Sequence, residues 1–257
     1  MDSKTSSFLL PFLPSPRNAR PYVTLTYAQS IDAKIAASDR KQLRLSGAES
    51  RYMTHRLRVL HEGILVGVGT GIGDDPGLNA RLPDPVNSPP CSLPQQPHPF
   101  ILDPTFRSPI TSETRLIRTA AAGHGHPPTY LVRSDAVLDE DKLQILQSVG
   151  GRVIKIPTTG PRALMWDDIL KAVYDTGIAS LMIEGGARVI ADVLREKAAD
   201  VVIVTIAPVY VGKEGVGIDI DGEGERGGGG EVGGEGWLRD VVWERFGGDV
   251  VLGGRIG

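Results

Sequence analysis

The chain has 257 residues, of which 40% are hydrophobic and 5% aromatic, and its formal net charge is −3. This length suits one large α/β domain with a core mostly of Val, Ile, Leu and Ala. The low net charge and the lack of a polybasic block argue against nucleic acid or an anionic membrane as partner. No apolar run approaches the ~20 residues that span a bilayer. Cys91 is the only cysteine, so an internal disulfide is impossible and a reducing, cytoplasmic location is expected.

The predicted elements follow one another as strands and helices. Residues 1–20 carry the apolar patch FLLPFL, interrupted by Pro11, and are predicted to be a packing arm rather than a signal peptide. Alternating or β-branched patterns predict strands over 21–28, 63–69, 99–106, 129–134, 151–157, 179–183 and 200–212, and two strands with a tight turn within 237–257. Amphipathic patterns predict helices over 45–62, 139–150, 163–177 and 187–196.

This alternation implies a single domain over 21–257 with a largely parallel sheet and helices on both of its faces. Ser46 and Glu49 have the spacing of a capping box at the start of the first amphipathic helix. Residues 83–99 are a Pro-rich loop, and the acidic, Gly-rich segment around 221–236 is interpreted as a mobile insertion loop.

The stretch GILVGVGTGIGDDPGLNARL, residues 63–82, begins as a buried strand and is then rich in glycine. Its glycines fit neither the dinucleotide fingerprint nor the P-loop, which also needs a lysine, and no helix is expected there. The exposed N–H groups could cradle a phosphate or a ribose edge, with Thr70 and Asp74 as polar anchors. A tight turn that uses Asp as a turn former is the equally weighted alternative.

The stretch LMIEGGARVIADVL, residues 181–194, predicts a strand that turns through Gly185 and Gly186 into a helix near Ala187. Free N–H groups at such a helix start attract phosphate, and glycine lets a ligand approach the backbone closely. The carboxylate of Glu184 would accept a hydrogen bond from a hydroxyl, amine or ring N–H. A plain strand–helix turn is the alternative.

Three further features are candidates for a site. Ser30, Asp32 and Lys34 form a polar cluster at a strand end, or else a hydrophilic loop. Arg58 and Arg81 would suit a phosphate ester if they converge, although each taken singly is more often a solvated surface charge. A zinc deaminase is excluded because Pro-Cys-x-x-Cys is missing, the histidines lack metal-ligand spacing, and no Gly-x-Ser-x-Gly elbow indicates a hydrolase.

Four runs together carry a family resemblance: TLTYAQSIDAKIA, ILVGVGTGIGDDPGLNAR, LMIEGGARVIADVL and WERFGGDVVLGGRI. They resemble the pyrimidine reductases of riboflavin biosynthesis, above all the stand-alone fungal and archaeal form, and span most of the chain from Pro21 to Gly257. The resemblance implies a dihydrofolate-reductase-like fold, NADPH as cofactor and a homodimer. It also implies an oxidoreductase that converts a phosphorylated ribosylaminopyrimidine into its ribitylamino form, without metal.

The resemblance assigns roles to particular residues. Lys34 matches the lysine of an Asp-Gly-Lys motif in which Ala33 replaces the glycine, and Lys34 and Glu184 are the candidate catalytic residues. The implied cofactor contacts are Ala28, Arg44, Thr70, Asp74, Gly185, Gly186, Ala187 and Arg188. The implied substrate contacts are Arg58, Leu78, Arg81 and Glu184, with the arginines facing the ribose 5′-phosphate.

Two other functions stay open at this point. One is a reductase of the deaminated pyrimidinedione or of a pterin on the same fold. The other is a non-catalytic NADPH-binding sensor, against which the presence of Lys34, Arg58, Arg81 and Glu184 argues.

Overall fold

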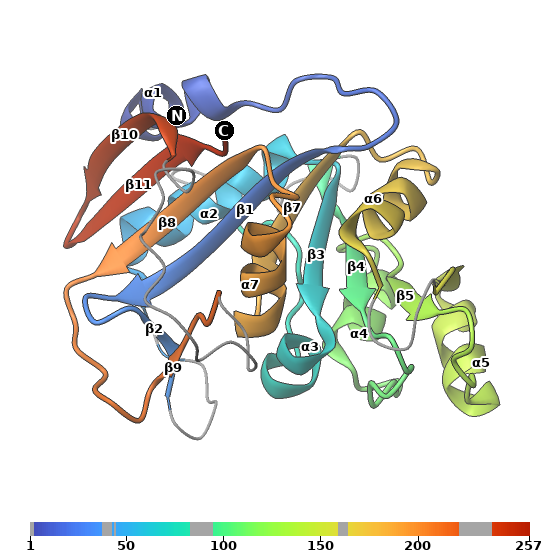
Figure 1. The fold of residues 1–257 in the computed structure, drawn as a ribbon. Helices are drawn as coiled ribbons and strands as arrows, with labels where there is room; N and C mark the ends of the chain where they lie inside the picture. The colour runs from blue at the N-terminus through green and yellow to red at the C-terminus, as the bar shows by residue number, and fades with distance from the viewer. Residues whose placement is uncertain (1–2, 38–42, 44, 83–94, 159–163, 221–237) are drawn as a thin grey trace, which may run out of the picture.

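The computed structural model describes residues 3–37, 43, 45–82, 95–158, 164–220 and 238–257. Arg44 and the insertion around 221–236 therefore lie outside the described residues. Within them, nine strands form one sheet in the order β10–β11–β8–β1–β7–β3–β4–β5–β6 (Figure 1), and β2 pairs with β9 in a separate ribbon. The bounds are β1 Tyr22–Ser30, β2 Lys34–Ala36, β3 Gly63–Gly67, β4 His98–Leu102, β5 Thr129–Arg133, β6 Arg152–Ile156, β7 Ser180–Gly185, β8 Val201–Ala207, β9 Val216–Gly217, β10 Arg239–Phe246 and β11 Asp249–Arg255.

The sheet is parallel from β8 to β6, and only β11 runs antiparallel to its described neighbours β8 and β10. The predicted α/β class with a largely parallel sheet is confirmed. The ribbon of β2 and β9 was not predicted, because two or three residues are too short to show a periodic pattern.

Helices cover both faces of the sheet, as predicted (Figure 1). On one face of the sheet, Leu65 of β3 packs in the core that also contains α6 and α7. On the other face, Ile64 and Val66 of β3 pack in the core that contains α4 and α5. Because successive strand residues point to opposite faces, burial on both faces explains the uninterrupted apolar runs. The helices are α1 Ser3–Leu9, η1 Leu10–Phe12, α2 Ala48–Leu60, α3 Val68–Asp74, α4 Arg115–Ala121, α5 Glu140–Ser148, α6 Trp166–Tyr174 and α7 Ala187–Arg195.

The N-terminal segment packs on the sheet through α1 and η1. Phe8 and Phe12 are buried in the core that also contains α2, and the Phe8 ring meets Phe246 edge-on at 5.5 Å. The segment is also bonded at its end. The buried carboxylate of Asp200, just before β8, accepts hydrogen bonds from Arg20 at 2.6 and 3.0 Å and from the Val23 backbone N–H at 2.8 Å. These contacts fasten the segment to the ends of β1 and β8.

The expectation that no helix follows the strand at 63–67 is wrong, because α3 begins at Val68. Glycine costs a helix about 1 kcal/mol relative to Ala, which is why the sequence argued against it. Packing overrides this low propensity: Val68 is buried, and Gly71 lies where a Cβ would meet Ile101 Cγ2 at 3.8 Å. The short helix thus rests on tertiary contacts.

The predicted capping box is also wrong. Gly47 is the N-cap of α2 and makes no side-chain cap bond. The acceptor is instead Asp249, at the start of β11, whose Oδ2 accepts from the Gly47 N–H at 2.7 Å and from the Ser50 hydroxyl. A residue of the C-terminal hairpin therefore fixes the start of α2, which no local sequence pattern reveals.

The strand predicted over 200–212 ends at Ala207, because Pro208 has no N–H for a ladder. The following loop is attached to the turn after β1 instead. Asp32 accepts from the Ser30 hydroxyl at 2.6 Å and from the N–H groups of Val211 and Gly212 at 3.1 and 2.7 Å. These hydrogen bonds lower the pKa of Asp32 from 3.8 to about 2.

An acid titration should reveal this attachment. Because the folded-state pKa of Asp32 lies below its unfolded value, the carboxylate stabilises the fold above about pH 4 and this contribution disappears as the pH falls toward 2. We expect Asp32→Asn to lower the Tm at pH 7 and to flatten the pH dependence of unfolding between about pH 4 and 2. Asp175→Asn, which removes an exposed carboxylate paired with Lys171, is the control. An unchanged acid slope in Asp32→Asn would contradict the assignment.

Candidate active site

Two neighbouring strand ends define the candidate site. β3 and β7 are parallel neighbours, and after a register shift Val66 pairs with Gly185. α3 follows β3 directly and α7 follows β7 after Gly186, so both helices begin at the same edge of the sheet (Figure 1). The carboxyl edge of a parallel sheet is where ligands bind in open α/β folds.

The glycine turn at this edge allows an unusually close approach of backbone and side chains. Gly185 has φ +91° and Gly186 φ +50°, in the left-handed region that favours glycine. A Cβ on Gly185 would lie 2.6 Å from Ile190 Cγ1, and one on Gly186 would lie 2.8 Å from Thr70 Oγ1. Thr70 Oγ1 also donates to the Gly185 carbonyl at 3.3 Å. The structure therefore brings together three residues that the sequence assigns to a cofactor.

The start of α7 is the second feature of the site. Its N-cap, Gly186, makes no side-chain cap bond, so the first-turn N–H groups at Ala187 and Arg188 have no side-chain acceptor at the cap. The Arg188 side chain is 87% exposed and lies 3.8 Å from Asp192. N–H groups at a helix start attract an anion, and an exposed cation in the first turn adds to this attraction.

Thr70 and Asp74 share one face of α3 because they are four residues apart. Partial burial raises the pKa of Asp74 above its ordinary 3.8. The next residue, Asp75, ends the helix at φ +38° and accepts from the Arg115 N–H at 3.0 Å. It thus caps α4, a helix that sequence reasoning did not predict.

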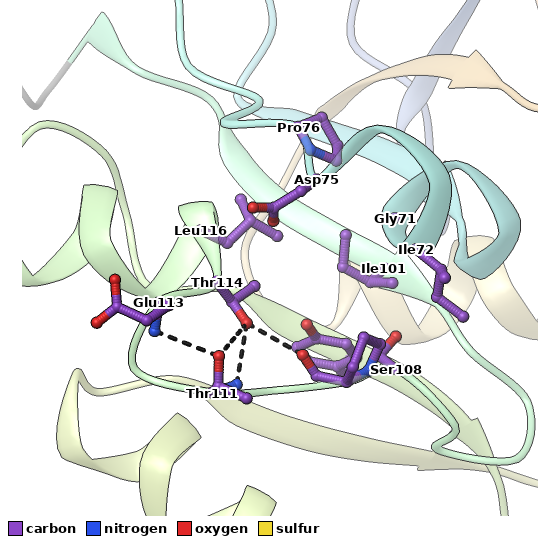
Figure 2. A pocket seen from close by; sticks show the side chains of 12 residues that line it. Gly71, Ile72, Asp75, Pro76, Ile101, Ser108, Thr111, Glu113, Thr114 and Leu116 are labelled. Carbon is purple, nitrogen blue, oxygen red and sulfur yellow. Dashed lines mark hydrogen bonds between the residues drawn. The ribbon is translucent and has the colours of Figure 1, made fainter. Parts of the chain in front are cut away.

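A cavity of about 320 Å³ lies beside α3. Figure 2 shows Ile72 and Asp75 on the α3 side, the loop with Thr111 and Thr114 opposite, and Ile101 between them. The loop is ordered by its own hydrogen bonds, in which Thr114 Oγ1 accepts from the Thr111 N–H at 2.9 Å. Sequence reasoning missed this cavity, since its lining comes from segments with no recognisable motif.

Arg58, near the end of α2, forms an ion pair with Glu184 at the end of β7. Its Nε and Nη2 each donate at 2.7 Å to one carboxylate oxygen, and its Nη1 donates to the Asn79 carbonyl at 2.9 Å. The two side chains are 10% and 18% exposed. The two predicted substrate residues thus bind each other, and the assignment of both arginines to a phosphate stays a prediction.

Arg81 has different partners. Its Nη1 donates to Asn79 Oδ1 at 2.9 Å and its backbone N–H donates to His55 Nδ1 at 3.1 Å. Loss of hydration and the positive charges of Arg58 and Arg115 lower its pKa. Within the described residues, no carboxylate lies within ion-pair distance of Arg81. Sequence reasoning missed His55, although its three-residue spacing from Arg58 on a helix was a usable signal.

Leu78 is placed differently from the expectation. Its side chain is only 2% exposed and packs in the core with Ile64 and Val66, so its side chain is not available at an open surface. Its φ of +51° is in the left-handed region. The buried side chain therefore anchors a strained turn that carries Asn79 and Arg81 to the surface.

The remaining predicted residues lie near the end of β1. Ala28 is half-buried and pairs with Thr205, and Lys34 begins β2, where its N–H donates to the Ser30 hydroxyl at 2.9 Å. Ala33 has φ +57°, so it occupies a conformation that favours the glycine of the family motif. In the part of the chain that the structure describes, Lys34 and Glu184 form no direct hydrogen bond or ion pair with each other.

The described residues show neither a metal-binding cluster nor a helix that could span a membrane. No group of three or more His, Cys, Asp or Glu side chains is arranged to hold a metal ion. No described helix has both the length and the apolar character that crossing a membrane requires.

Comparison with known proteins identifies similar chains. Residues 21–252 match the RibD C-terminal domain family. The 2,5-diamino-6-ribosylamino-4(3H)-pyrimidinone 5′-phosphate reductase of Debaryomyces hansenii is 37% identical over 84% of this chain and 86% of its own. The Candida glabrata protein of the same name is 36% identical over 97% of this chain and 95% of its own. The solved riboflavin biosynthesis reductase of Saccharomyces cerevisiae superimposes with a TM-score of 0.76, at 27% identity, covering 99% of this chain and 100% of that one. The resemblance inferred from the four sequence runs is confirmed.

The glycine turn yields a matched stability test. Gly185 and Gly177 both have φ +91°, so an alanine at either position incurs about 1–2 kcal/mol of backbone strain. A Cβ at Gly177 meets nothing within 4 Å, whereas at Gly185 it would overlap Ile190, which is 1% exposed. We expect Gly185→Ala to lower the free energy of unfolding by a further ~1–3 kcal/mol compared with Gly177→Ala, measured by chemical denaturation. Equal losses would show that Ile190 moves aside freely.

Proposed function

The chain belongs to the RibD C-terminal domain family, and from this premise we propose that it is an NADPH-dependent reductase of 2,5-diamino-6-ribosylamino-4(3H)-pyrimidinone 5′-phosphate. Relatives that match over most of both chains carry that activity in their names. The observation that carries the proposal onto this chain is the grouping of Arg81, the Arg58–Glu184 pair and the glycine turn at one sheet edge.

The donor set fits a dinucleotide phosphate. Gly185 and Gly186 let Ile190 and Thr70 pack directly against the turn, and the start of α7 offers backbone N–H groups to a phosphate. Thr70 and Asp74 would hold the cofactor from α3, and exposed Arg188 is the candidate partner for a 2′-phosphate, the group that separates NADPH from NADH. The cavity beside α3, bounded by Ile72 and Ile101, would take an apolar part such as the adenine ring. When bound, the cofactor supplies the hydride.

The polar residues beside the turn would orient the substrate. Each Glu184 oxygen accepts one bond from Arg58 and keeps a further lone pair for an N–H of the pyrimidine. Arg81 would bind the 5′-phosphate at the other end. Holding the substrate at both ends fixes C1′ relative to the cofactor. Conversion to the ribitylamine also requires a proton, for which Lys34 is the candidate donor.

Turnover with freshly prepared substrate tests the function. We expect wild-type protein to oxidise NADPH, and NADH more weakly, in step with formation of the ribitylamino product. Parallel assays with the deaminated pyrimidinedione and with a pterin would identify those alternatives. If the protein binds NADPH but oxidises it with none of the three compounds, the proposed reaction is overturned and the interpretation as a non-catalytic sensor is favoured.

The two arginines should respond differently to substitution. Arg81→Ala should lower kcat/KM about 10- to 150-fold by removing charged hydrogen bonds. The loss should shrink on substrate that lacks the 5′-phosphate, and NADPH affinity should stay unchanged. Arg58→Ala should lower kcat/KM on both substrates, because it releases Glu184. Lys171→Ala, which removes an exposed cation on α6, is the control. Equal losses of kcat/KM on both substrates for Arg81→Ala would contradict the proposal that Arg81 binds the 5′-phosphate.

We also propose that the protein is a homodimer through the open sheet face at β8, β11 and β10. The register places Val204, Leu252 and Trp243 in one row across these strands, and directly paired residues point to the same face. The row runs from buried Val204 to Trp243, which is 58% exposed, and Val250 beside it is 39% exposed. An exposed apolar row on the edge of a sheet favours covering by a second copy.

A charge in this row should therefore separate the dimer. We expect Trp243→Lys to shift the molecular mass measured by light scattering from two chains to one, with the circular dichroism spectrum retained. Val137→Lys, at a position that is 87% exposed in a loop, is the control and should leave the mass unchanged. A wild-type monomer, or a Trp243→Lys dimer, would contradict this interface.

A further inference from the structure

The two arginines of the site differ in what neutralises them. The charge of Arg58 is balanced by both oxygens of Glu184. The guanidinium of Arg81 is held by Asn79 Oδ1, a neutral amide oxygen, at 2.9 Å. Arg81 is thus positioned by a hydrogen bond without losing its charge to a carboxylate among the described residues.

The other group on Arg81 is neutral as well. His55 Nδ1 accepts from the Arg81 N–H, which requires an unprotonated Nδ1. Burial, and to a smaller extent the charges of Arg58, Arg81 and Arg51, together lower the pKa of His55 to about 3. Near neutral pH His55 therefore adds no charge beside Arg81. The charged groups that act on Arg81 are Arg58, Arg115 and Glu184, and since Glu184 balances only one of the arginines, a net positive charge is left that favours an anion.

Asn79 connects both arginines and is itself held firmly. Its backbone carbonyl accepts from Arg58 Nη1 at 2.9 Å. On one side Leu78 is buried in the core, and on the other Gln96 pairs with Ala80, accepting from its N–H at 2.6 Å and donating to its carbonyl at 3.1 Å. The amide oxygen of Asn79 consequently has a defined position relative to both guanidinium groups.

We propose that Asn79 is a positioning residue that determines specificity for a phosphate monoester, because its neutral amide orients the Arg81 guanidinium while leaving its charge for the ligand. This inference rests on the proposed function. Aspartate has the same shape and keeps the acceptor, although it loses the Nδ2 donor that faces the His124 carbonyl at 3.5 Å. It would form an ion pair with Arg81 and compete with the phosphate for that charge.

The test compares Asn79→Asp with Asn79→Ala in the full chain. Binding of ribose 5-phosphate is measured by calorimetry, and kcat and KM are measured on substrate with and without its 5′-phosphate. We expect Asn79→Asp to weaken ribose 5-phosphate binding by about 10-fold or more and Asn79→Ala by less, since alanine loses orientation only. The rise should appear in KM for the phosphorylated substrate, with kcat and NADPH affinity little changed.

A double-mutant cycle separates positioning from a structural role. In the Arg81→Ala background, Asn79→Ala should have almost no further effect, because Asn79 acts through Arg81. Wild-type affinity in Asn79→Asp, or a loss from Asn79→Ala that persists without Arg81, would overturn the proposal. A wild type that binds ribose 5-phosphate without reducing the pyrimidine would overturn the proposed function but not this inference. A wild type that binds neither ribose 5-phosphate nor the substrate would overturn both.

Discussion

The bidentate ion pair between Arg58 and Glu184 is the contact on which the candidate site depends. It joins the end of α2 to the end of β7 across 126 residues of sequence, and both side chains are largely removed from water. Loss of one partner leaves the other charge uncompensated, which in buried pairs costs about 3–5 kcal/mol. The pair also gives Arg58 and Arg81 different roles. With Arg58 bound to Glu184, Arg81 is the cation left to meet a ligand.

Three of the segments that carry candidate site residues contain a strained residue. Ala33, Asp75 and Leu78 have φ of +57°, +38° and +51°, in a region where non-glycine residues cost of order 1–3 kcal/mol each. Each is held by a contact of its own segment: the Ser30–Asp32 hydrogen bonds, the cap on α4, and the buried Leu78 side chain. Such conformations persist only where the surroundings over-determine them.

Much of the fold could be predicted because its signals are local or periodic. The strand–glycine turn–helix at 180–195 and the closing hairpin can be read from alternation and glycine alone. The α3 helix could not be predicted, since its glycines give it a low helix propensity and its contacts with β3 and β4 leave no local pattern in the sequence. For the site, sequence could nominate Arg58, Arg81 and Glu184. It could not show which of the two arginines Glu184 neutralises, because an ion pair between residues 126 positions apart produces no recognisable pattern in the sequence.

The position of the substrate residues is finally set from the far end of α2. Asp249 of the C-terminal hairpin caps its first turn through Gly47 and Ser50, and the last turns of the same helix present His55 and Arg58. Residues 79–81 belong to no helix or strand, yet their backbone groups bond to side chains of His55, Arg58 and Gln96. Buried polar backbone groups need such partners, so a rotation or shift of α2 would displace both the Arg58–Glu184 pair and the Arg81 loop together. The hairpin thus holds the end of α2 opposite to the one that presents Arg58.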